Sequence, residues 1–369
     1  MANRNIATVI VSAIAIPDHS LGSWGKLIDY WLQSYSENTI DYILCPPSAT
    51  KLVSKVTKAF DCPYPQREIN RDWYLKWRYR KYEQALEQIF KQHDGAVIVV
   101  LENTKLKNII SQWIAKNGLV SKAKVIFYQP GFSYEFTRDE YKHFKNGLNE
   151  MILLTKSAYQ YERMKYHEYP FLVHVLYNPI DSKIFFPLDK ATKNLARTKL
   201  GWQQDETIFL WVSHDRPKKG LDVILRVWQQ VAQKYPESKL VVVGVKRDTK
   251  ILGVEFKGKL PNHEIAQYYQ AADVFLFSSL CQEGFPLSLA EAMSSGCYSI
   301  ASDAGGVAEF LLNTGHAINY APAMAEEWLL HIDHYMKNKP IQVAQNSFMP
   351  LDEWCGKFQS ILEMSANSL

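Results

Sequence analysis

The chain has 369 residues, of which 47% are apolar and 22% charged, and its formal net charge is +4. This composition excludes a disordered chain, a collagen and a disulfide scaffold, and the length suggests two domains. Its five cysteines are odd in number and widely spaced, and it has no run of about 18 apolar residues, so we expect free thiols, no membrane-spanning helix and a cytoplasmic protein.

In the first half of the chain, apolar runs rich in β-branched residues alternate with amphipathic stretches. This alternation is typical of βαβ units. We expect strands near residues 7–14, 41–44, 96–101, 124–128 and 151–154, and helices near 23–35, 73–92, 105–116 and 157–166.

The second half repeats this rhythm after an irregular segment, 173–187, in which Asn178-Pro179 interrupts regular structure. The sequence therefore predicts an α/β protein with two doubly wound, Rossmann-like domains, residues 1–178 and 179–345, and a ligand site in the cleft between them. A terminal helix within 346–369 packs against one domain or crosses back to the first. We expect strands near 207–212, 239–243, 274–277 and 297–301, and helices near 220–234, 262–270, 286–294, 305–311 and 351–364.

The segment 273–309 carries the strongest chemical signal. A strand ends at Ser278, a short loop holds Glu283 and Gly284, and a helix begins at Pro286 and ends near Gly296. Backbone N–H groups at the start of that helix, those of Phe285, Leu287 and Ser288, would form an anion site.

Two carboxylates flank this predicted anion site, Glu283 before the helix and Glu291 within it. They suit a diphosphate with a sugar at each end, because each carboxylate would then accept hydrogen bonds from hydroxyl groups. The spacing alone leaves an alternative, in which Glu283 is a helix-dipole partner and Glu291 a solvated residue.

The surrounding sequence resembles the retaining glycosyltransferases of family 4, which have the GT-B fold and an E-x₇-E signature. Glu283 and Glu291 occupy the two acidic positions. The stretch 257–273 is similar to the family's segment before the signature, 178–181 to its interdomain linker and 303–306 to its following loop. The similarity is close from about residue 150 to 312.

The resemblance implies transfer of a hexose-type sugar from a nucleoside-diphosphate sugar, UDP- or GDP-linked, with no other cofactor. Glu283 would approach the transferred sugar, and Glu291 would accept hydrogen bonds from the ribose. The backbone from Gly284 through Phe285, Pro286, Leu287 and Ser288 would hold the diphosphate, and Lys259 and Leu260 would frame the base.

A second cluster, residues 211–222, follows the first strand of the C-terminal half. Its Lys219-Gly220 matches the family's Lys-Gly pair, whose lysine neutralises the departing diphosphate. The family usually has an arginine about five residues before this lysine. Here His214 stands in that position and Arg216 lies two residues later, so the sequence does not determine which side chain pairs with Lys219 in donor binding. The alternative is a solvated basic turn.

In the first domain the resemblance points to weaker sites. Gly22 would let the backbone approach the donor phosphate or the acceptor, with a plain flexible turn as the alternative. His19 would contact the acceptor, with a surface loop histidine as the alternative. The family often has a histidine after the fourth or fifth strand. Tyr128 or Gln129 stands there instead, and either substitutes for it or the contact is lost.

No D-x-D, H-E-x-x-H or Cys/His ligand spacing occurs, so no metal site is expected. Residues 1–178 carry 23 Lys and Arg against 17 Asp and Glu, a net charge of +6, and 67–82 interleaves basic and aromatic residues. We therefore hypothesise a glycan or lipid-linked acceptor, as in polysaccharide or lipopolysaccharide assembly, at an anionic membrane surface. An aromatic helix packed on the sheet is the alternative, and nucleic acid ranks far behind.

Two other functions fit the same residues. One is a catalytically silent sugar-nucleotide-binding subunit, which the missing histidine and displaced arginine favour. The other is a sugar-nucleotide epimerase or hydrolase of similar fold, which would turn over its nucleotide-sugar without an acceptor.

Overall fold

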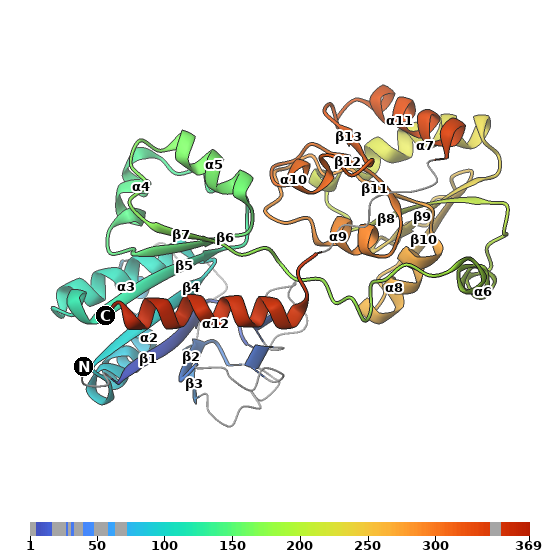
Figure 1. Ribbon diagram of the computed structural model, residues 1–369. Coiled ribbons are helices and arrows are strands. Elements are labelled where there is room, and N and C mark those ends of the chain that lie inside the picture. The colour runs from blue at the N-terminus through green and yellow to red at the C-terminus, as the bar shows by residue number, and fades with distance from the viewer. Residues whose placement is uncertain are drawn as a thin grey trace. The chain divides into compact units, whose positions relative to one another are not determined.

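The computed structural model describes residues 5–16, 27–28, 31–32, 40–47, 58–62, 72–339 and 348–369. The chain divides into two compact units. Unit 1 comprises Met1–Leu154, Tyr159–Leu176 and Asp352–Leu369, and unit 2 comprises Thr155–Ala158 and Tyr177–Leu351. Each unit has its own β-sheet with helices packed around it (Figure 1).

Unit 1 contains a seven-stranded parallel sheet in the order β3-β2-β1-β4-β5-β6-β7. All seven residues of the central strand β4 are buried, which is why this strand is a continuous apolar run. Side chains of α2 and α3 pack in the core on one face, and α12 lies on the other side of the sheet (Figure 1). The elements are β1 (Ile6–Ser12), β2 (Tyr42–Cys45), β3 (Lys58–Asp61), α2 (Asp72–Gln92), β4 (Gly95–Leu101), α3 (Thr104–Lys116), the 3₁₀ turn η1 (Val120–Lys122), β5 (Ala123–Gln129), α4 (Arg138–Lys145), β6 (Glu150–Leu153), α5 (Lys156–Lys165), β7 (Leu172–Val175) and α12 (Leu351–Asn367).

Unit 2 contains a six-stranded parallel sheet in the order β10-β9-β8-β11-β12-β13. Helices α7 and α11 share one core with Phe209 and Trp228, and α6 and α8 lie on the other side of the sheet (Figure 1). The elements are α6 (Lys190–Leu200), β8 (Thr207–Val212), the 3₁₀ turn η2 (Pro217–Lys219), α7 (Leu221–Lys234), β9 (Ser238–Val243), β10 (Val254–Gly258), α8 (Asn262–Ala271), β11 (Val274–Phe277), α9 (Leu287–Ser294), β12 (Tyr298–Ser302), α10 (Ala308–Leu311), β13 (Ala317–Asn319) and α11 (Ala325–Asn338).

The strand orders confirm the predicted fold class, because each sheet is parallel and doubly wound around a central pair of strands. Several elements were not expected from the sequence. The strands among them lie at sheet edges, and the residues of β10 are all only partly buried, so the apolar patterns of these strands are weak. These elements are β3, α4, β7, α6, β10, β13 and α11.

The connection between the units differs from the predicted linker, 173–187. Leu172–Val175 forms β7 and pairs in parallel with β6, so the irregular segment begins only after it. The part of unit 1 that precedes the main segment of unit 2 ends at Leu176, whereas the predicted domain limit is residue 178.

The terminal helix α12 belongs to unit 1. Trp354 and Phe358 are fully buried, and the Phe358 ring centroid lies 5.0 Å from that of Trp31. Near the end of the helix, the Ser365 hydroxyl donates to the buried Glu150 carboxylate at 2.8 Å. The helix is therefore part of the packed structure of unit 1.

Candidate functional site

The candidate site of unit 2 lies where the order of the strands in its parallel sheet reverses. Strands β8 and β11 are neighbours in the sheet but are far apart in the chain, and from this pair the strand order runs outward to both edges. Ligands of open α/β sheets bind outside the carboxyl ends of such a pair. Both predicted motifs follow these two strands, the Lys219 cluster after β8 and the Glu283 loop after β11.

Lys219 and Glu283 form an ion pair at this point. The Lys219 Nζ lies 2.5 Å from the Glu283 Oε1, and the same oxygen accepts a hydrogen bond from the Ser279 hydroxyl at 2.5 Å. The two side chains are 23% and 17% exposed, so the pair is largely shielded but still reachable by a ligand. The structure thus brings together the two residues predicted to be catalytic.

Gly220 allows the Lys219 loop to reach the end of β11. Its φ is +71°, and a Cβ there would lie 2.0 Å from the Ser278 carbonyl oxygen. The Ser278 hydroxyl donates to the Lys219 carbonyl oxygen at 2.9 Å and accepts from the Trp211 indole at 2.9 Å. These bonds fix the backbone that carries Lys219.

A second close approach fixes the backbone of Glu283. Glu283 and Gly305 form a β-bridge, and the Gly306 N–H donates to the Glu283 carbonyl at 2.9 Å. A Cβ on Gly306 would lie 2.7 Å from the Gly284 carbonyl oxygen. The loop after β12, predicted to follow the signature, therefore supports the loop that holds Glu283.

The start of α9 differs in two details from the expectation. The helix begins at Leu287, with Pro286 as its N-cap residue, and the Leu287 N–H donates to the Phe285 carbonyl at 3.0 Å. The Leu287 N–H is therefore already hydrogen-bonded, so the prediction that it is free for an anion was wrong. The Ser288 side chain is half-buried, and Gly296, with φ of +87°, follows the helix as expected.

Glu291 has a partner that sequence reasoning missed, the tyrosine at position 269 on α8. Burial, and then the charge of the nearby Glu291 carboxylate, raise the pKa of Tyr269 well above its usual value. The Tyr269 hydroxyl therefore stays protonated beside Glu291. No spacing in the sequence signals this contact, since α8 and α9 are separated by β11.

Positive side chains gather around His214 in the loop after β8. Burial, and then the charges of Arg216, Lys259 and Lys219, hold the pKa of His214 below its usual value, because each cation disfavours a second positive charge. Arg216 and Lys259 are exposed, and Leu260 beside them is half-buried. The predicted donor-binding residues Arg216 and Lys259 thus come into one electrostatic cluster with Lys219.

An acidic residue in the same loop is neutralised by an arginine. The Asp215 Oδ1 lies 2.8 Å from the Arg247 Nη2, and the Arg247 Nη1 lies 2.8 Å from the Asp222 Oδ1. The two carboxylates raise the pKa of Arg247. Their charge is therefore partly balanced, and the edge of the loop that holds Lys219 stays positive.

The predicted acceptor residues of unit 1 are not accessible. Tyr128 is 0% and Gln129 1% exposed. The Tyr128 ring packs on Phe358 of α12, and the Gln129 amide donates to the Phe132 carbonyl at 3.1 Å. Both are core residues in this structure, which argues against the predicted acceptor contact. His19 and Gly22 lie outside the described residues.

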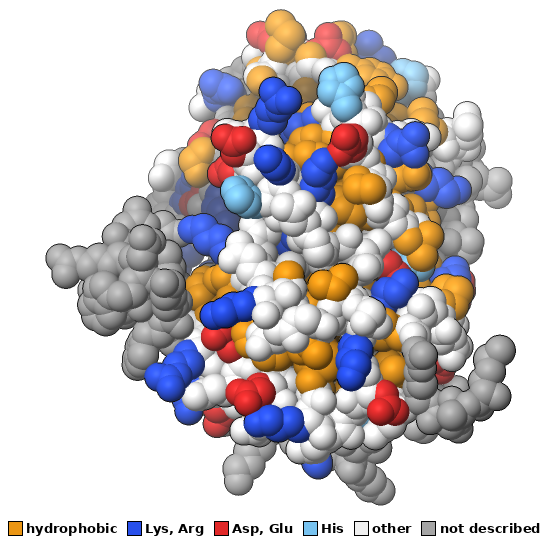
Figure 2. Space-filling view, turned by 90° about the vertical axis from the view of Figure 1, so that its left-hand side faces the viewer, with side chains coloured by type: hydrophobic (Ala, Val, Ile, Leu, Met, Phe, Trp, Pro, Cys, Tyr) orange, Lys and Arg blue, Asp and Glu red, His pale blue; other side chains and the backbone are white. Residues whose placement is uncertain are grey.

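The basic and aromatic stretch 67–82 is described only in part, and the side chains before Tyr79 lie outside the described residues. Tyr79 and Tyr82 are buried, and the Tyr82 hydroxyl donates to the Ser12 carbonyl at 2.8 Å. On the face shown in Figure 2, Lys and Arg are interspersed with Asp and Glu and do not form one continuous patch. These tyrosines agree with the packing alternative for their end of the stretch.

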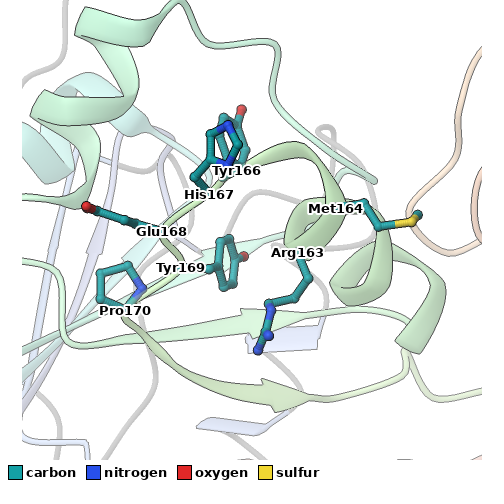
Figure 3. Close-up of a pocket in the computed structure, with 7 residues that line it drawn as sticks. All are labelled: Arg163, Met164, Tyr166, His167, Glu168, Tyr169 and Pro170. Carbon is teal, nitrogen blue, oxygen red and sulfur yellow. The ribbon is translucent and has the colours of Figure 1, made fainter.

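A pocket of about 580 Å³ lies elsewhere in unit 1, at the end of α5 and the segment before β7 (Figure 3). It contains none of the predicted site residues. Its lining residues are Arg163, Met164, Tyr166, His167, Glu168, Tyr169 and Pro170.

The described part of the chain also bears on membrane spans, metal sites and disulfides. None of its helices is both long and apolar enough to cross a bilayer. Within those residues, no group of three or more His, Cys, Asp or Glu side chains is placed to hold a metal ion. The cysteines, at positions 45, 62, 281, 297 and 355, are all free, as predicted.

Comparison with known families connects this geometry to an enzyme class. Residues 192–347, which hold every element of the candidate site, match the family model described as glycosyl transferases group 1. This part of the chain is similar to glycosyltransferases. The glycosyltransferase-like segment therefore includes Lys219, Glu283, Glu291 and the start of α9.

Curated relatives belong to the same class. The chain is 26% identical over 216 residues to mannosylfructose-phosphate synthase of Agrobacterium fabrum, covering 52% of this chain and 47% of that protein. It is 28% identical over 182 residues to a GDP-mannose-dependent monoacylated alpha-(1-6)-phosphatidylinositol monomannoside mannosyltransferase of Corynebacterium glutamicum, covering 45% and 48%. The matches thus span about half the length of these relatives.

Solved structures share the fold over the whole chain. Anabaena HepE, in complex with UDP and glucose, aligns with a TM-score of 0.70 at 15% identity and covers 98% of this chain and 100% of its own. At this level of identity the likeness concerns the fold alone, the two-domain α/β arrangement of GT-B proteins.

Proposed function

We propose that the chain is a glycosyltransferase that moves a hexose-type sugar from a nucleoside-diphosphate sugar to a glycan or lipid-linked acceptor, with retention of anomeric configuration. One observation carries the proposal. Lys219 and Glu283 meet at the central β8/β11 position of unit 2, directly before α9, within the glycosyltransferase-like segment.

In this proposal the donor diphosphate binds at the amino end of α9, where backbone N–H groups and the helix dipole favour an anion. Lys219 leaves Glu283 and binds the diphosphate, and Glu283 then accepts hydrogen bonds from the sugar hydroxyls. The Ser279 hydroxyl stays hydrogen-bonded to the Glu283 carboxylate during this exchange, because it donates to the same oxygen as Lys219. Glu291, beside Tyr269, accepts hydrogen bonds from the ribose.

Transfer breaks the bond between the sugar's anomeric carbon and the leaving phosphate oxygen, and forms the bond from that carbon to the acceptor oxygen on the same face. The acceptor proton passes to the departing phosphate, so no side chain has to act as general base. Negative charge grows on the leaving diphosphate, and Lys219, with Arg216 and Lys259 beside it, supplies fixed positive charge there. We propose that these side chains, rather than a metal ion, stabilise that charge.

The base of the donor is proposed to be uridine or guanosine. The Corynebacterium relative is named as GDP-mannose-dependent, and HepE was solved with UDP. A thermal-shift panel of UDP-, GDP-, ADP- and CMP-sugars tests this, because a ligand that binds only the folded chain raises its melting temperature. Stabilisation by an ADP- or CMP-sugar alone contradicts the proposed choice.

The acceptor is proposed to be reached at the cytoplasmic face of an anionic membrane. The Corynebacterium relative is named for a lipid acceptor, and residues 1–178 are the basic half of this chain. Flotation with anionic and with neutral vesicles tests the contact. Equal absence of binding to both vesicle types would remove the membrane from the proposal.

A silent nucleotide-sugar-binding subunit is the second candidate, favoured by the buried positions of Tyr128 and Gln129, where the family often has a histidine. It shares the donor site but predicts no turnover. Enzyme kinetics therefore separate the two candidates.

The decisive variants are Lys219→Ala and Glu283→Gln, compared with Lys218→Ala as the control. Lys218 is the adjacent lysine of the same turn, and it is exposed. We expect Lys219→Ala to lower the rate of sugar transfer by about 10²–10³-fold, the usual loss for a group that stabilises transition-state charge. Transfer at the wild-type rate by both site variants would show that the catalytic assignment is wrong.

A further inference from the structure

Unit 1 has its own central strand pair, β1 and β4, from which the strand order runs outward to both edges. The two strands pair in parallel up to Ser12 opposite Leu101. The first residue beyond this ladder on β4 is Glu102. By the rule that places ligands outside the carboxyl ends of such strands, Glu102 lies at the ligand-binding edge of unit 1.

The backbone of Glu102 has a rare conformation. Its φ is +60°, and the Asn103 N–H donates to the Leu101 carbonyl at 2.6 Å across it. A three-residue turn closed in this way with a positive central φ is the strained form of the γ-turn. A glycine would adopt it at little steric expense, yet a glutamate occupies the position.

Neighbouring groups hold this conformation in place. The Glu102 N–H donates to the Tyr128 carbonyl at 3.0 Å, and its own carbonyl accepts from the Tyr134 hydroxyl at 2.7 Å. The Tyr134 ring is stacked on Phe136, with centroids 5.6 Å apart. Tyr128, predicted to contact the acceptor, thus supports the Glu102 backbone instead.

The Glu102 carboxyl group is suited to neutral hydrogen-bond donors. The residue is open to solvent, although surrounding protein displaces enough water to raise its pKa. No ion pair to it is formed by the described residues. Backbone strain of this kind persists at functional sites, where the position of one side chain matters.

We propose that Glu102 is an acceptor-binding residue, whose carboxylate accepts hydrogen bonds from hydroxyl groups of a glycosyl acceptor at the β1/β4 edge of unit 1. The inference rests on the proposed function, and it names the chemical class of acceptor group that unit 1 recognises. It also supplies the acceptor contact that the buried Tyr128 and Gln129 do not make.

The first experiment measures strain with Glu102→Gly. Relief of the positive φ should raise the melting temperature by about 2 °C or more, as a stabilisation near 1 kcal/mol does in a chain of this size. Lys339→Gly is the matched control, because Lys339 also has a positive φ, +34°, and ends α11 in unit 2. An unchanged or lowered melting temperature for Glu102→Gly, beside a raised one for Lys339→Gly, overturns the strain argument.

The second experiment measures acceptor binding with Glu102→Gln and Glu102→Gly. The probes are methyl glycosides of mannose, glucose, galactose and N-acetylglucosamine, with nucleoside-diphosphate release as the readout. For the glycoside that stimulates release, both variants should lower kcat/KM for the glycoside by about tenfold or more, the loss of one hydrogen bond to a charged group. The KM for the donor should stay within twofold, as it should in Lys339→Gly.

The outcomes separate this inference from the function it rests on. If the wild-type chain binds a nucleotide-sugar and both Glu102 variants keep the wild-type kcat/KM for the glycoside, the inference is wrong while the proposed function stands. Release that no glycoside stimulates also overturns it, because a hydroxyl group of a sugar is then not the ligand. If the wild-type chain neither binds nor consumes a nucleotide-sugar, the proposed function fails, and the inference fails with it.

Discussion

The two units share a parallel-sheet architecture, but the described side chains at the carboxyl ends of their central strands differ in charge. In unit 2 the edge of β8 and β11 holds Lys219, Arg216 and Lys259, whose charges all act on His214. Two acids of this edge are paired, Glu283 with Lys219 and Asp215 with Arg247. In unit 1 the edge of β1 and β4 presents Glu102 on a strained turn. A basic edge suits a diphosphate, and an acidic one suits sugar hydroxyl groups.

Net charge alone would have suggested the reverse. The first 178 residues carry a net charge of +6, and the remaining residues carry 19 Lys and Arg against 21 Asp and Glu, a net charge of −2. In each half of the chain, the charge of the few side chains at the strand ends is therefore opposite in sign to the net charge of that half. Charge counts describe the solvent surface of a domain better than its binding site.

The largest expected effect comes from the close approach of the Gly220 loop to the Ser278 backbone in unit 2. Gly220→Ala places a Cβ 2.0 Å from the Ser278 carbonyl oxygen, whereas Gly201, with a similar φ of +75°, has nothing within 4 Å. We expect Gly220→Ala to lower the free energy of unfolding by about 3 kcal/mol or more, and Gly201→Ala by about 1 kcal/mol. Urea denaturation measures both, and equal losses would show that the loops do not constrain each other.

The next prediction concerns unit 1 and the buried lysine of α3. Lys107 is 0% exposed, its amino group donates to the carbonyl oxygens of Phe144 and Asn146, and burial lowers its pKa to about 7. The unfolded chain binds more protons at this site between pH 7 and about 10.4, so stability rises with pH in that window, by a few kcal/mol at most.

The variant Lys107→Met removes this titration. Its free energy of unfolding should therefore rise less between pH 7 and pH 10 than that of the wild type, although it is less stable overall because the Phe144 and Asn146 carbonyl groups lose their donor. Urea denaturation at several pH values gives the two slopes. Parallel slopes would mean that Lys107 does not titrate there.

Unit 2 has a smaller pH effect in an acidic window. The His316 Nδ1 accepts the Ser299 N–H at 3.0 Å, and burial lowers the pKa of His316 to about 4. In the unfolded chain the pKa of His316 is about 6.5, so between pH 6.5 and pH 4 the unfolded chain binds a proton at His316 that the folded chain does not. The free energy of unfolding therefore falls by up to about 3 kcal/mol as the pH is lowered from 6.5 to 4. His316→Asn, which keeps an acceptor near Ser299, should flatten that part of the profile. An unaltered profile would refute the assignment.

How much of this was predictable depends on where each residue lies. The buried strands β1, β4 and β8 were predicted because both faces of a parallel sheet are covered and the strands become continuous apolar runs. β7 and β10 are edge strands with partly exposed residues, so the apolar patterns of their sequences are too weak to predict a strand.

The candidate site shows the same division. Lys219 and Glu283 were predicted because the residues around them resemble motifs of a known family, and such motifs are local in the sequence. Three features had no local signal in the sequence. They are the proximity of Tyr269 to Glu291, the hydrogen bond of the Leu287 N–H and the positive φ of Glu102. These features arise from how separate strands and helices pack, which a linear pattern does not specify.

The most direct test of the central claim is a crystal structure of this chain with UDP or GDP bound. We predict the diphosphate at the amino end of α9, with the Lys219 amino group moved from the Glu283 carboxylate onto a phosphate oxygen and Glu291 on the ribose. A nucleotide bound elsewhere, with the ion pair between Lys219 and Glu283 intact, would contradict the account.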